Sequence, residues 1–310
     1  MREDSRTNPL LRLAPQVSEA IRYRQGVVAL ESALVTHGLP LPWNLEAALG
    51  AEASVRATEA MPATIAVHGG ELLVGLSEEE IGELAHAPDA LKVSRQNLAS
   101  ALGGSGWGGT TVSATMLASA LAGIGVFATG GIGGVHRGAG TSFDVSADLE
   151  ELARTPVTVV CSGPKSLLDA PATLEYLETR GVPVVGLGTD ELPGFYSLGT
   201  GLALGAEVKT PTQAADLVVR HRQLGLGGAV LFVVPVPEDE ALPRDEAEEA
   251  VGQALREAST AGIRGPKATP WVLRRVAELT EGRSIRANVA LISHNASVAG
   301  EIARSLAEVG

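Results

Sequence analysis

The chain has 310 residues, of which 45% are hydrophobic, 3% are aromatic and 37 are glycine, and its net charge is −12. This length allows a large aliphatic core, and the acidic balance argues against a nucleic-acid polymer as a partner, because such a partner needs a basic surface. Cys161 is the only cysteine, so no intrachain disulfide can form and a reducing cytoplasm suits the chain, and no apolar run is long enough to span a membrane.

Predicted strands and helices alternate along the chain. The first residues carry acids and no apolar core, so they are not a signal peptide, and we expect a loosely ordered arm over residues 1–16. The apolar, β-branched runs predict strands at 27–30, 64–67, 72–74, 125–128, 157–161, 182–185 and 229–234. The amphipathic stretches predict helices at 44–59, 77–86, 110–122, 166–180, 212–224, 244–261, 269–280 and from about 295.

Continuous apolar strands that are linked by helices favour an α/β fold. Such strands are typical of a mostly parallel sheet that is covered by helices on both faces. We find no internal repeat and no low-complexity linker, and we therefore predict a single domain over residues 1–310.

Polar residues follow several of the predicted strands. Glu31 and Ser32 follow the first strand, the glycine turn that begins at Thr129 follows the fourth, and Ser162 and Lys165 follow the fifth. In open α/β sheets, ligands bind outside the carboxyl ends of the strands. If these strands are parallel, one edge collects an acid, a hydroxyl, a glycine loop and a lysine, which together predict a catalytic pocket for a polar molecule.

Lys165 has an unusual predicted position. Ser166 to Asp169 has the pattern of a capping box that opens a helix, so Lys165 would lie between a buried strand and a positive helix end. Both the helix end and desolvation disfavour the ammonium form, and they leave more free amine near neutral pH. The alternative is a surface lysine that extends past the helix start, and the residues alone favour it.

Two glycine-rich stretches differ in what they predict. The first, 103–109, contains a formal G-x-G-x-x-G, but no predicted strand precedes it and no acid follows at the spacing that a ribose needs, which excludes a dinucleotide site. The second, 129–140, follows a strand, and its amides could form an anion-binding nest. The alternative is that its glycines only permit a turn.

Long stretches of the chain resemble the pseudouridine-5'-phosphate glycosidase family, which includes the indigoidine-synthase-A-like proteins. The resemblance extends from about Val17 to the C-terminus, and the stretches that carry it include VALESALVTHGLP, MPATIAVHGG, KVSRQNLA, GGTTVSATM, VFATGGIGGVHRGAGTSFDVSADLEEL, TPVTVVCSGPKSLLD, LETRGVPVVGLGTDELPGFY and NVALISHNA. It implies a three-layer α/β/α fold with a large, mostly parallel, mixed sheet, a homotrimer, a cytoplasmic location and a divalent metal, Mn2+ or else Mg2+ or another ion. The implied reaction, which is reversible, splits the C–C glycosidic bond of pseudouridine 5'-phosphate to give ribose 5-phosphate and uracil.

The resemblance assigns catalysis to Lys165 and Glu31. A C–C bond offers no heteroatom to protonate, so its cleavage needs an electron sink, which a lysine supplies by forming an imine with the ring-opened sugar. The resemblance makes Glu31 the proton donor, and a glutamate against apolar walls can keep its proton at neutral pH. The alternative for Glu31 is a carboxylate at a helix N-terminus.

The resemblance also implies a metal ligand and several substrate contacts. Asp144 is the implied metal ligand, and its hard oxygens suit Mn2+ or Mg2+, although a single carboxylate leaves most of the coordination sphere to water. The implied substrate contacts are Lys92, Val112, Ser146, Ala147 and Asp148. Taken alone, Lys92 is a solvated cation, Val112 a core residue and Asp148 the start of a helix.

Further residues in the matching motifs are expected near the site. We expect Thr129, His136 and Asn288 to contact the substrate, with His136 relaying protons and Asn288 holding uracil, whereas Arg95 is a weaker phosphate candidate. The roles of His37 and Arg137 stay open.

Two other functions remain as alternatives: a non-catalytic sugar-phosphate-binding protein, and a Schiff-base lyase for a different substrate in pigment biosynthesis. We expect Glu31, the Thr129 turn, Asp144 and Lys165 to surround one cavity.

Overall fold

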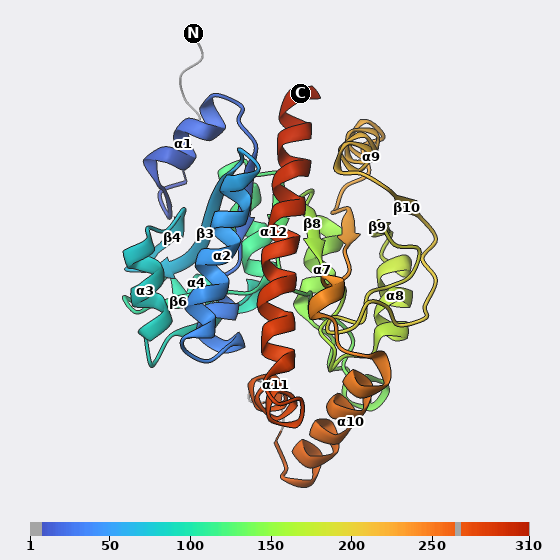
Figure 1. Cartoon of the computed structure of the whole chain (residues 1–310). Coiled ribbons are helices and arrows are strands. Elements are labelled where there is room, and N and C mark those ends of the chain that lie inside the picture. The colour runs from blue at the N-terminus through green and yellow to red at the C-terminus, as the bar shows by residue number, and fades with distance from the viewer. Residues whose placement is uncertain (1–7, 264–267, 310) are drawn as a thin grey trace.

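A computed structural model describes residues 8–263 and 268–309 of the chain (Figure 1). Its elements form one eleven-stranded mixed sheet with helices on both faces. The strands are β1 (Leu11–Leu13), β2 (Val27–Leu30), β3 (Met61–His68), β4 (Glu71–Val74), β5 (Leu91–Val93), β6 (Gly108–Thr110), β7 (Val126–Ala128), β8 (Thr158–Cys161), β9 (Val184–Leu187), β10 (Glu207–Val208) and β11 (Leu231–Val233).

The centre of the sheet is parallel because its strands are apolar on both faces. Strands β3, β2, β7, β8, β11, β9 and β10 lie side by side in this order, and each neighbouring pair is parallel. Within β2, Val28 and Leu30 point into one hydrophobic core while Val27 and Ala29 point into the other. The predicted mostly parallel sheet, buried on both faces, is confirmed.

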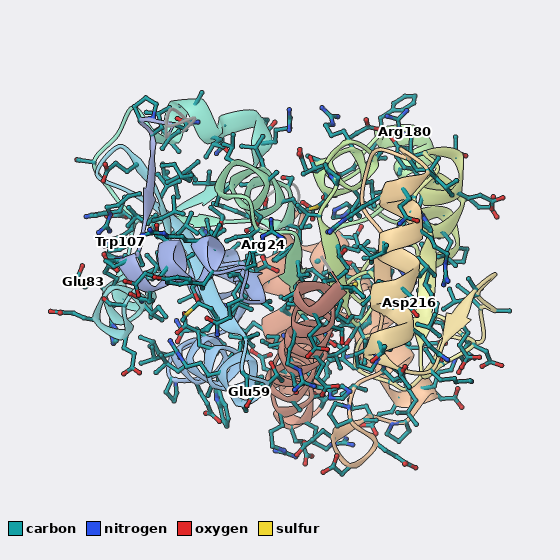
Figure 2. The ribbon with its side chains drawn as sticks, turned by 90° about the horizontal axis from the view of Figure 1, so that it is seen from above. Arg24, Glu59, Glu83, Trp107, Arg180 and Asp216 are labelled. Atoms are coloured by element: carbon teal, nitrogen blue, oxygen red, sulfur yellow. The ribbon has the colours of Figure 1, made fainter. Side chains whose placement is uncertain are left out.

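Two helical layers cover the sheet. One face carries α2 (Trp43–Ala57), α9 (Pro211–Gln223), α10 (Arg244–Thr260), α11 (Ala268–Leu279) and α12 (Arg283–Val309). The other face carries α1 (Pro15–Arg22), α5 (Val112–Ala122), α7 (Ala147–Arg154) and α8 (Ala170–Thr179). Figure 1 shows α12 running the length of the molecule in front of the strands, with α2 beside it. Figure 2 shows the layers from above, between Glu83 and Trp107 at one end and Asp216 and Arg180 at the other.

The remaining strands make the sheet mixed. The first half of β3 pairs with β2, whereas its second half pairs antiparallel with β6 on that same side and with β4 on the other. β5 pairs with β6, so both short strands lie beyond the carboxyl end of β2. The remaining helices of the described residues are η1 (Leu34–Gly38, a π-helix), α3 (Glu78–His86), η2 (Arg95–Asn97), α4 (Leu98–Ala101), α6 (Ala139–Ser142) and η3 (Glu238–Glu240).

The structure differs from three sequence-based expectations. We expected a loosely ordered arm over residues 1–16, of which residues 1–7 lie outside the described residues. Residues 11–13 form β1, which pairs in parallel with β4, so this part of the expected arm belongs to the sheet. Helix α8 begins at Ala170 rather than Ser166, because Asp169 caps it by accepting the Ala172 amide and Leu168 is buried instead. Helix α12 begins at Arg283, twelve residues before the expected start.

None of the described helices has the combination of length and apolar character that crossing a membrane requires.

Candidate active site

Glu31 lies at the carboxyl end of β2 and is almost fully buried, with 5% of its surface exposed. The hydroxyl of Thr129, the first residue after β7, donates a hydrogen bond to Glu31 Oε1. Leu30, Leu34 and neighbouring apolar side chains surround the carboxyl group. Burial raises the pKa of Glu31, and the nearby charge of Lys165 and the Thr129 hydrogen bond oppose that rise in part. These surroundings favour the protonated carboxyl, which is the form that a proton donor needs.

Lys165 lies in the loop that follows β8. Its backbone amide donates a hydrogen bond to Ile132 O at 3.1 Å, and Pro164 forms an isolated parallel β-bridge with Ile132. These contacts join the loop after β8 to the loop after β7. Lys165 is half-buried, and it lines a cavity of about 650 Å³. Helix α8 begins at Ala170, four residues later than predicted, and its first residues line the same cavity as Lys165.

Four charged residues form what we call the four-charge group: Glu31, Lys92, Asp148 and Lys165. Lys92 as a residue is exposed, but partial loss of water around its ammonium lowers its pKa, and so does the Lys165 charge, whereas Asp148 and Glu31 raise that pKa. Asp148 and Lys165 also act on the Glu31 carboxyl. The structure thus brings together residues from four separate segments of the chain, and both predicted catalytic residues are among them.

Asp148 joins two helix N-termini to the glycine loop. Its Oδ1 accepts the amide of Ser113 in the first turn of α5 at 3.0 Å, and its Oδ2 accepts the Gly133 amide at 2.9 Å. The hydroxyl of Ser146 caps α7 by accepting the Asp148 amide. Val112 is the first residue of α5 and is fully buried, while Ala147 is exposed at the first position of α7. Four of the predicted substrate residues therefore lie at two adjacent helix N-termini, where backbone amides favour anions: Val112, Ser146, Ala147 and Asp148.

Asp144 lies apart from the four-charge group. It is exposed, its backbone oxygen accepts the His136 amide, and its carboxylate is 3.9 Å from Nδ1 of the half-buried His136. Phe143, just before it, adopts a positive φ of 53° and is itself exposed. Within the described residues, no three His, Cys, Asp or Glu side chains are grouped to hold a metal. One exposed carboxylate fits an ion that keeps most of its water ligands, as Mg2+ does.

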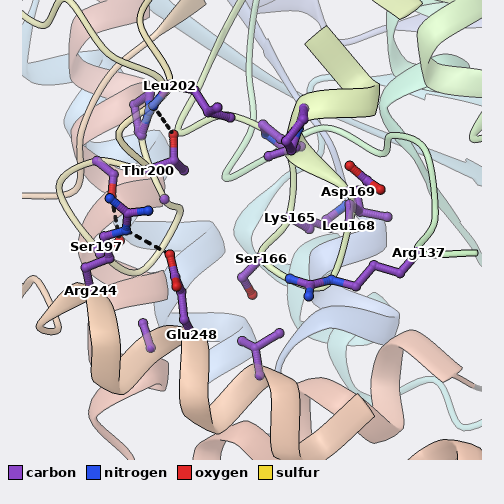
Figure 3. A pocket seen from close by; sticks show the side chains of 18 residues that line it. Arg137, Lys165, Ser166, Leu168, Asp169, Ser197, Thr200, Leu202, Arg244 and Glu248 are labelled. Carbon is purple, nitrogen blue, oxygen red and sulfur yellow. Dashed lines mark hydrogen bonds and ion pairs between the residues drawn. The ribbon is translucent and has the colours of Figure 1, made fainter. Parts of the chain in front are cut away.

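The expected single cavity is therefore wrong in part. Among the described residues, Lys165 lines the large cavity, whereas Glu31 and Thr129 line a second, small hollow. Figure 3 shows the large cavity, with Arg137 extending into it from the side opposite Arg244 and its partner Glu248.

The second glycine loop is explained by close packing. A Cβ at Gly131 would lie 2.6 Å from the Phe195 ring, and one at Gly133 would lie 2.2 Å from Ser146 Oγ. Several of the loop amides already donate within the protein, including those of Ile132 and Gly133. The structure favours the packing interpretation over an anion-binding nest formed by this loop.

Arg95 is engaged in a structural ion pair. One of its guanidinium nitrogens donates to both oxygens of Glu151, at 2.8 and 2.7 Å, and Glu151 is fully buried. Thr155 also donates to Glu151. Arg95 neutralises a buried carboxylate and is not free for a phosphate.

Helix α12 adds two asparagines that lie near the site. Asn288 is buried, and its Oδ1 would lie 3.5 Å from a Cβ at Gly130, which places it beside the Thr129 turn. Asn295 is also buried and hydrogen-bonds to that turn. Sequence reasoning missed Asn295, although its spacing of seven residues from Asn288 places both on one helix face.

His37 also lies near the site. It belongs to the π-helix η1 that follows Glu31, its Nδ1 is 2.6 Å from Thr36 Oγ1, and burial and the Lys92 charge lower its pKa. Cys161 at the end of β8 is fully buried, which raises its pKa to about 12 and leaves it a poor nucleophile beside Lys165.

Comparison with known proteins gives a consistent result over nearly the whole chain. The family model described as "Indigoidine synthase A like protein" matches residues 16–305. A pseudouridine-5'-phosphate glycosidase of Paracoccus denitrificans (strain Pd 1222) is 52% identical over 301 residues, covering 96% of this chain and 99% of the relative. One of Herpetosiphon aurantiacus is 53% identical over 294 residues, covering 95% and 97%.

Two solved structures resemble this fold closely. The prealnumycin C-glycosynthase AlnA, solved in complex with ribulose 5-phosphate, has a TM-score of 0.90 and 37% identity, covering 97% of this chain and 98% of its own. An indigoidine synthase A-like protein from Thermotoga maritima has a TM-score of 0.86 and 32% identity, covering 96% and 97%.

Proposed function

The chain belongs to the family of indigoidine synthase A-like proteins and is an enzyme, and we propose that it is a pseudouridine-5'-phosphate glycosidase. The observation that carries the proposal is the pairing of a buried carboxyl that favours its proton, Glu31, with a half-buried lysine, Lys165, in one electrostatic group. A glycosidase that breaks a C–C bond needs both an acid and an amine nucleophile.

The chemistry of these two residues runs as follows. Glu31 donates its proton to the sugar ring oxygen as the ring opens, and the Lys165 nitrogen forms a bond to the anomeric carbon. The nitrogen then returns its extra proton to the Glu31 carboxylate, and its freed lone pair forms the imine as the C–C bond breaks. The electron pair of that bond leaves on the uracil carbon, which takes the proton from Glu31. Water hydrolyses the imine, releases ribose 5-phosphate and restores the lysine amine.

The substrate phosphate is proposed to lie at the two helix N-termini. The positive ends of α5, which begins at Val112, and of α7, which begins at Ala147, supply positive charge for an anion together with the Lys92 ammonium. On the base side, the buried Asn288 amide and His136 are proposed to contact uracil.

Asp144 is proposed to hold a divalent ion, Mn2+ or Mg2+, through one carboxylate oxygen. The ion would supply positive charge for the phosphate. By the same family membership we propose a homotrimer that acts in the cytoplasm in pseudouridine catabolism.

The test is uracil release from pseudouridine 5'-phosphate, with and without Mn2+. We expect release by the wild type, loss of release in Lys165→Ala and Glu31→Ala by about 10⁴-fold or more, and lower Mn2+ stimulation in Asp144→Asn. Borohydride added with ribose 5-phosphate should trap an adduct whose mass maps to Lys165. Lys209→Ala serves as a matched control, because Lys209 is an exposed lysine paired with Glu207. An adduct on any other residue would refute the nucleophile assignment.

A further inference from the structure

Asn295 is a fully buried side chain that joins helix α12 to two strand ends. Its Nδ2 donates to the backbone oxygen of Thr129 at 3.0 Å and is 3.4 Å from that of Gly130. It is also 3.1 Å from Ser162 Oγ, and that hydroxyl is 3.3 Å from Asn295 Oδ1. Thr129 and Gly130 follow β7, whereas Ser162 follows β8, so one amide group connects three segments of the chain.

The residues that hydrogen-bond to Asn295 are each close to one of the two catalytic groups, either through a further hydrogen bond or along the chain. Thr129 holds Glu31 through its hydroxyl, and Ser162 lies three residues before Lys165 in the same loop. The Ser162 amide donates to Gly130 O at 2.9 Å, which couples the two loops further. A shift of Asn295 would therefore change how Thr129 is aimed at the Glu31 carboxyl.

We propose that Asn295 is a positioning residue that fixes the Thr129 turn and so sets the position of the Glu31 carboxyl. The inference rests on the proposed function only for its kinetic consequence. Asn295 acts through Thr129 and has no direct contact with Glu31 among the described hydrogen bonds.

The chemistry of an amide explains why an asparagine is required here. Its NH2 group supplies donors to two backbone oxygens that would otherwise be buried without that partner, and its oxygen can accept from Ser162. An aspartate has the same shape but would place a second oxygen against the Thr129 and Gly130 oxygens. A substitution to aspartate therefore tests the donor without removing volume.

The positions on α12 support the same conclusion. Asn288, Ile292 and Asn295 are spaced four and three residues apart, so they share one face of the helix. Ile292 lines the hollow at Glu31, and Asn288 lies beside Gly130. Because Asn295 joins α12 to the ends of β7 and β8, it also fixes the position of Asn288 relative to those strand ends.

The experiment compares Asn295→Asp, Asn295→Ala and Ser162→Ala with the wild type. For the Asn295 variants we expect kcat for uracil release to fall by about 10²-fold, because a small misplacement of a catalytic group has that cost. KM should change little. The Thr129 hydrogen bond stabilises the Glu31 carboxylate, so its loss raises the Glu31 pKa and moves the basic limb of the kcat profile to higher pH. Ser162→Ala removes one partner and should give a smaller change in the same direction.

A second readout needs no turnover. The Glu31 carboxyl is titrated by NMR in protein labelled with 13C-glutamate, and its midpoint should move to higher pH in the Asn295 variants. Borohydride trapping of ribose 5-phosphate on Lys165 should persist, because this free sugar opens without enzyme. If wild type releases no uracil, the proposed function fails, but a shifted Glu31 titration would still support the positioning role.

Ser284→Ala is the matched control. Ser284 is a buried hydroxyl on the same helix that bonds to Thr280, and none of the described hydrogen bonds joins its side chain to the Thr129 turn. This variant should lower the unfolding temperature without moving the kcat profile or the Glu31 titration. An unshifted Glu31 titration in both Asn295→Asp and Ser162→Ala would overturn the proposal. The proposal would also be overturned if the Asn295 variants lost no more kcat than a Ser284 variant with the same unfolding temperature.

Discussion

A single buried carboxyl, Glu31, is where stability and chemistry conflict in this protein. Its pKa is raised by burial, so the folded chain keeps this proton at a pH at which the unfolded chain has released it. The free energy of unfolding must then fall as pH rises from the ordinary glutamate pKa of 4.5 toward the raised folded value. The site thus loses stability above the ordinary glutamate pKa, and the same shift keeps a proton that the acid can donate.

Replacing this carboxyl by a neutral isostere should separate stability from activity. We expect Glu31→Gln to abolish uracil release, to remove the decline of stability above pH 4.5 and to raise the midpoint of thermal unfolding near neutral pH by about 2 °C, the response of a chain of this size to about 1 kcal/mol. Calorimetry over a pH series measures this.

The control for that experiment is Glu52→Gln. Glu52 is equally buried, but it pairs with Arg56 and accepts from Thr64, so its replacement should give no rise. A midpoint for Glu31→Gln at or below that of the wild type at neutral pH would show that the folded site stabilises the carboxylate.

Residue-level prediction from sequence worked best for side chains at strand ends. Glu31, Thr129 and Lys165 each follow a buried apolar strand, and parallel strands bring their carboxyl ends to one edge. Asp148 was tied to the substrate by resemblance, but its two backbone partners lie 35 and 15 residues away and only the fold brings them together. Asn295 was missed for the same reason, because its partners lie more than 130 residues away.

At the scale of elements, burial explains which predictions held. The β-branched runs that became β2, β8 and β11 have no polar face, so a buried parallel strand was their only stable solution. The short strands β5 and β6 were missed because glycine and exposed residues carry no strand pattern. The start of α8 was misplaced because Leu167 and Leu168 are drawn into the core and Asp169 caps the helix instead.

The glycine loop after β7 can be tested at a single position. A Cβ at Gly133 would lie 2.2 Å from Ser146 Oγ and 2.6 Å from Asp148 Oδ2, so Gly133→Ala should displace the start of α7. We expect a loss of about 1–3 kcal/mol in unfolding free energy and a rise in KM, because overpacking forces neighbouring groups to move. Urea unfolding and initial rates of uracil release measure the two effects.

The same loop offers a matched control in Gly140. A Cβ there would meet nothing within 4 Å, so Gly140→Ala should change stability by less than about 0.5 kcal/mol and leave KM as it is. Equal effects from the two substitutions would show that the loop responds to lost flexibility and not to contact with Ser146 and Asp148.

The whole molecule depends on the seating of α12. This helix packs on α2 and α9 and contacts β2, β7 and β8, so it is shared by both halves of the sheet. Two glycines allow its close approach: Gly26 lies against the backbone of Ala303, and Gly300 lies against Thr58 at the end of α2. Because α12 also carries Asn288 and Asn295, its position links the packing of the whole chain to the site.

A methyl group at Gly300 should therefore disturb both stability and catalysis. Its Cβ would lie 2.2 Å from Thr58 Oγ1, and we expect Gly300→Ala to lower the unfolding free energy by about 1–3 kcal/mol and to reduce kcat for uracil release. Gly252→Ala is the control, since a Cβ there would meet only the flexible end of Arg256. The variant Thr58→Ala removes the hydroxyl that the new methyl group would meet. The double variant Thr58→Ala/Gly300→Ala should therefore lose less unfolding free energy than the sum of the losses in the two single variants. Strict additivity, or a kcat unchanged despite lost stability, would show that α12 packing and the site are independent.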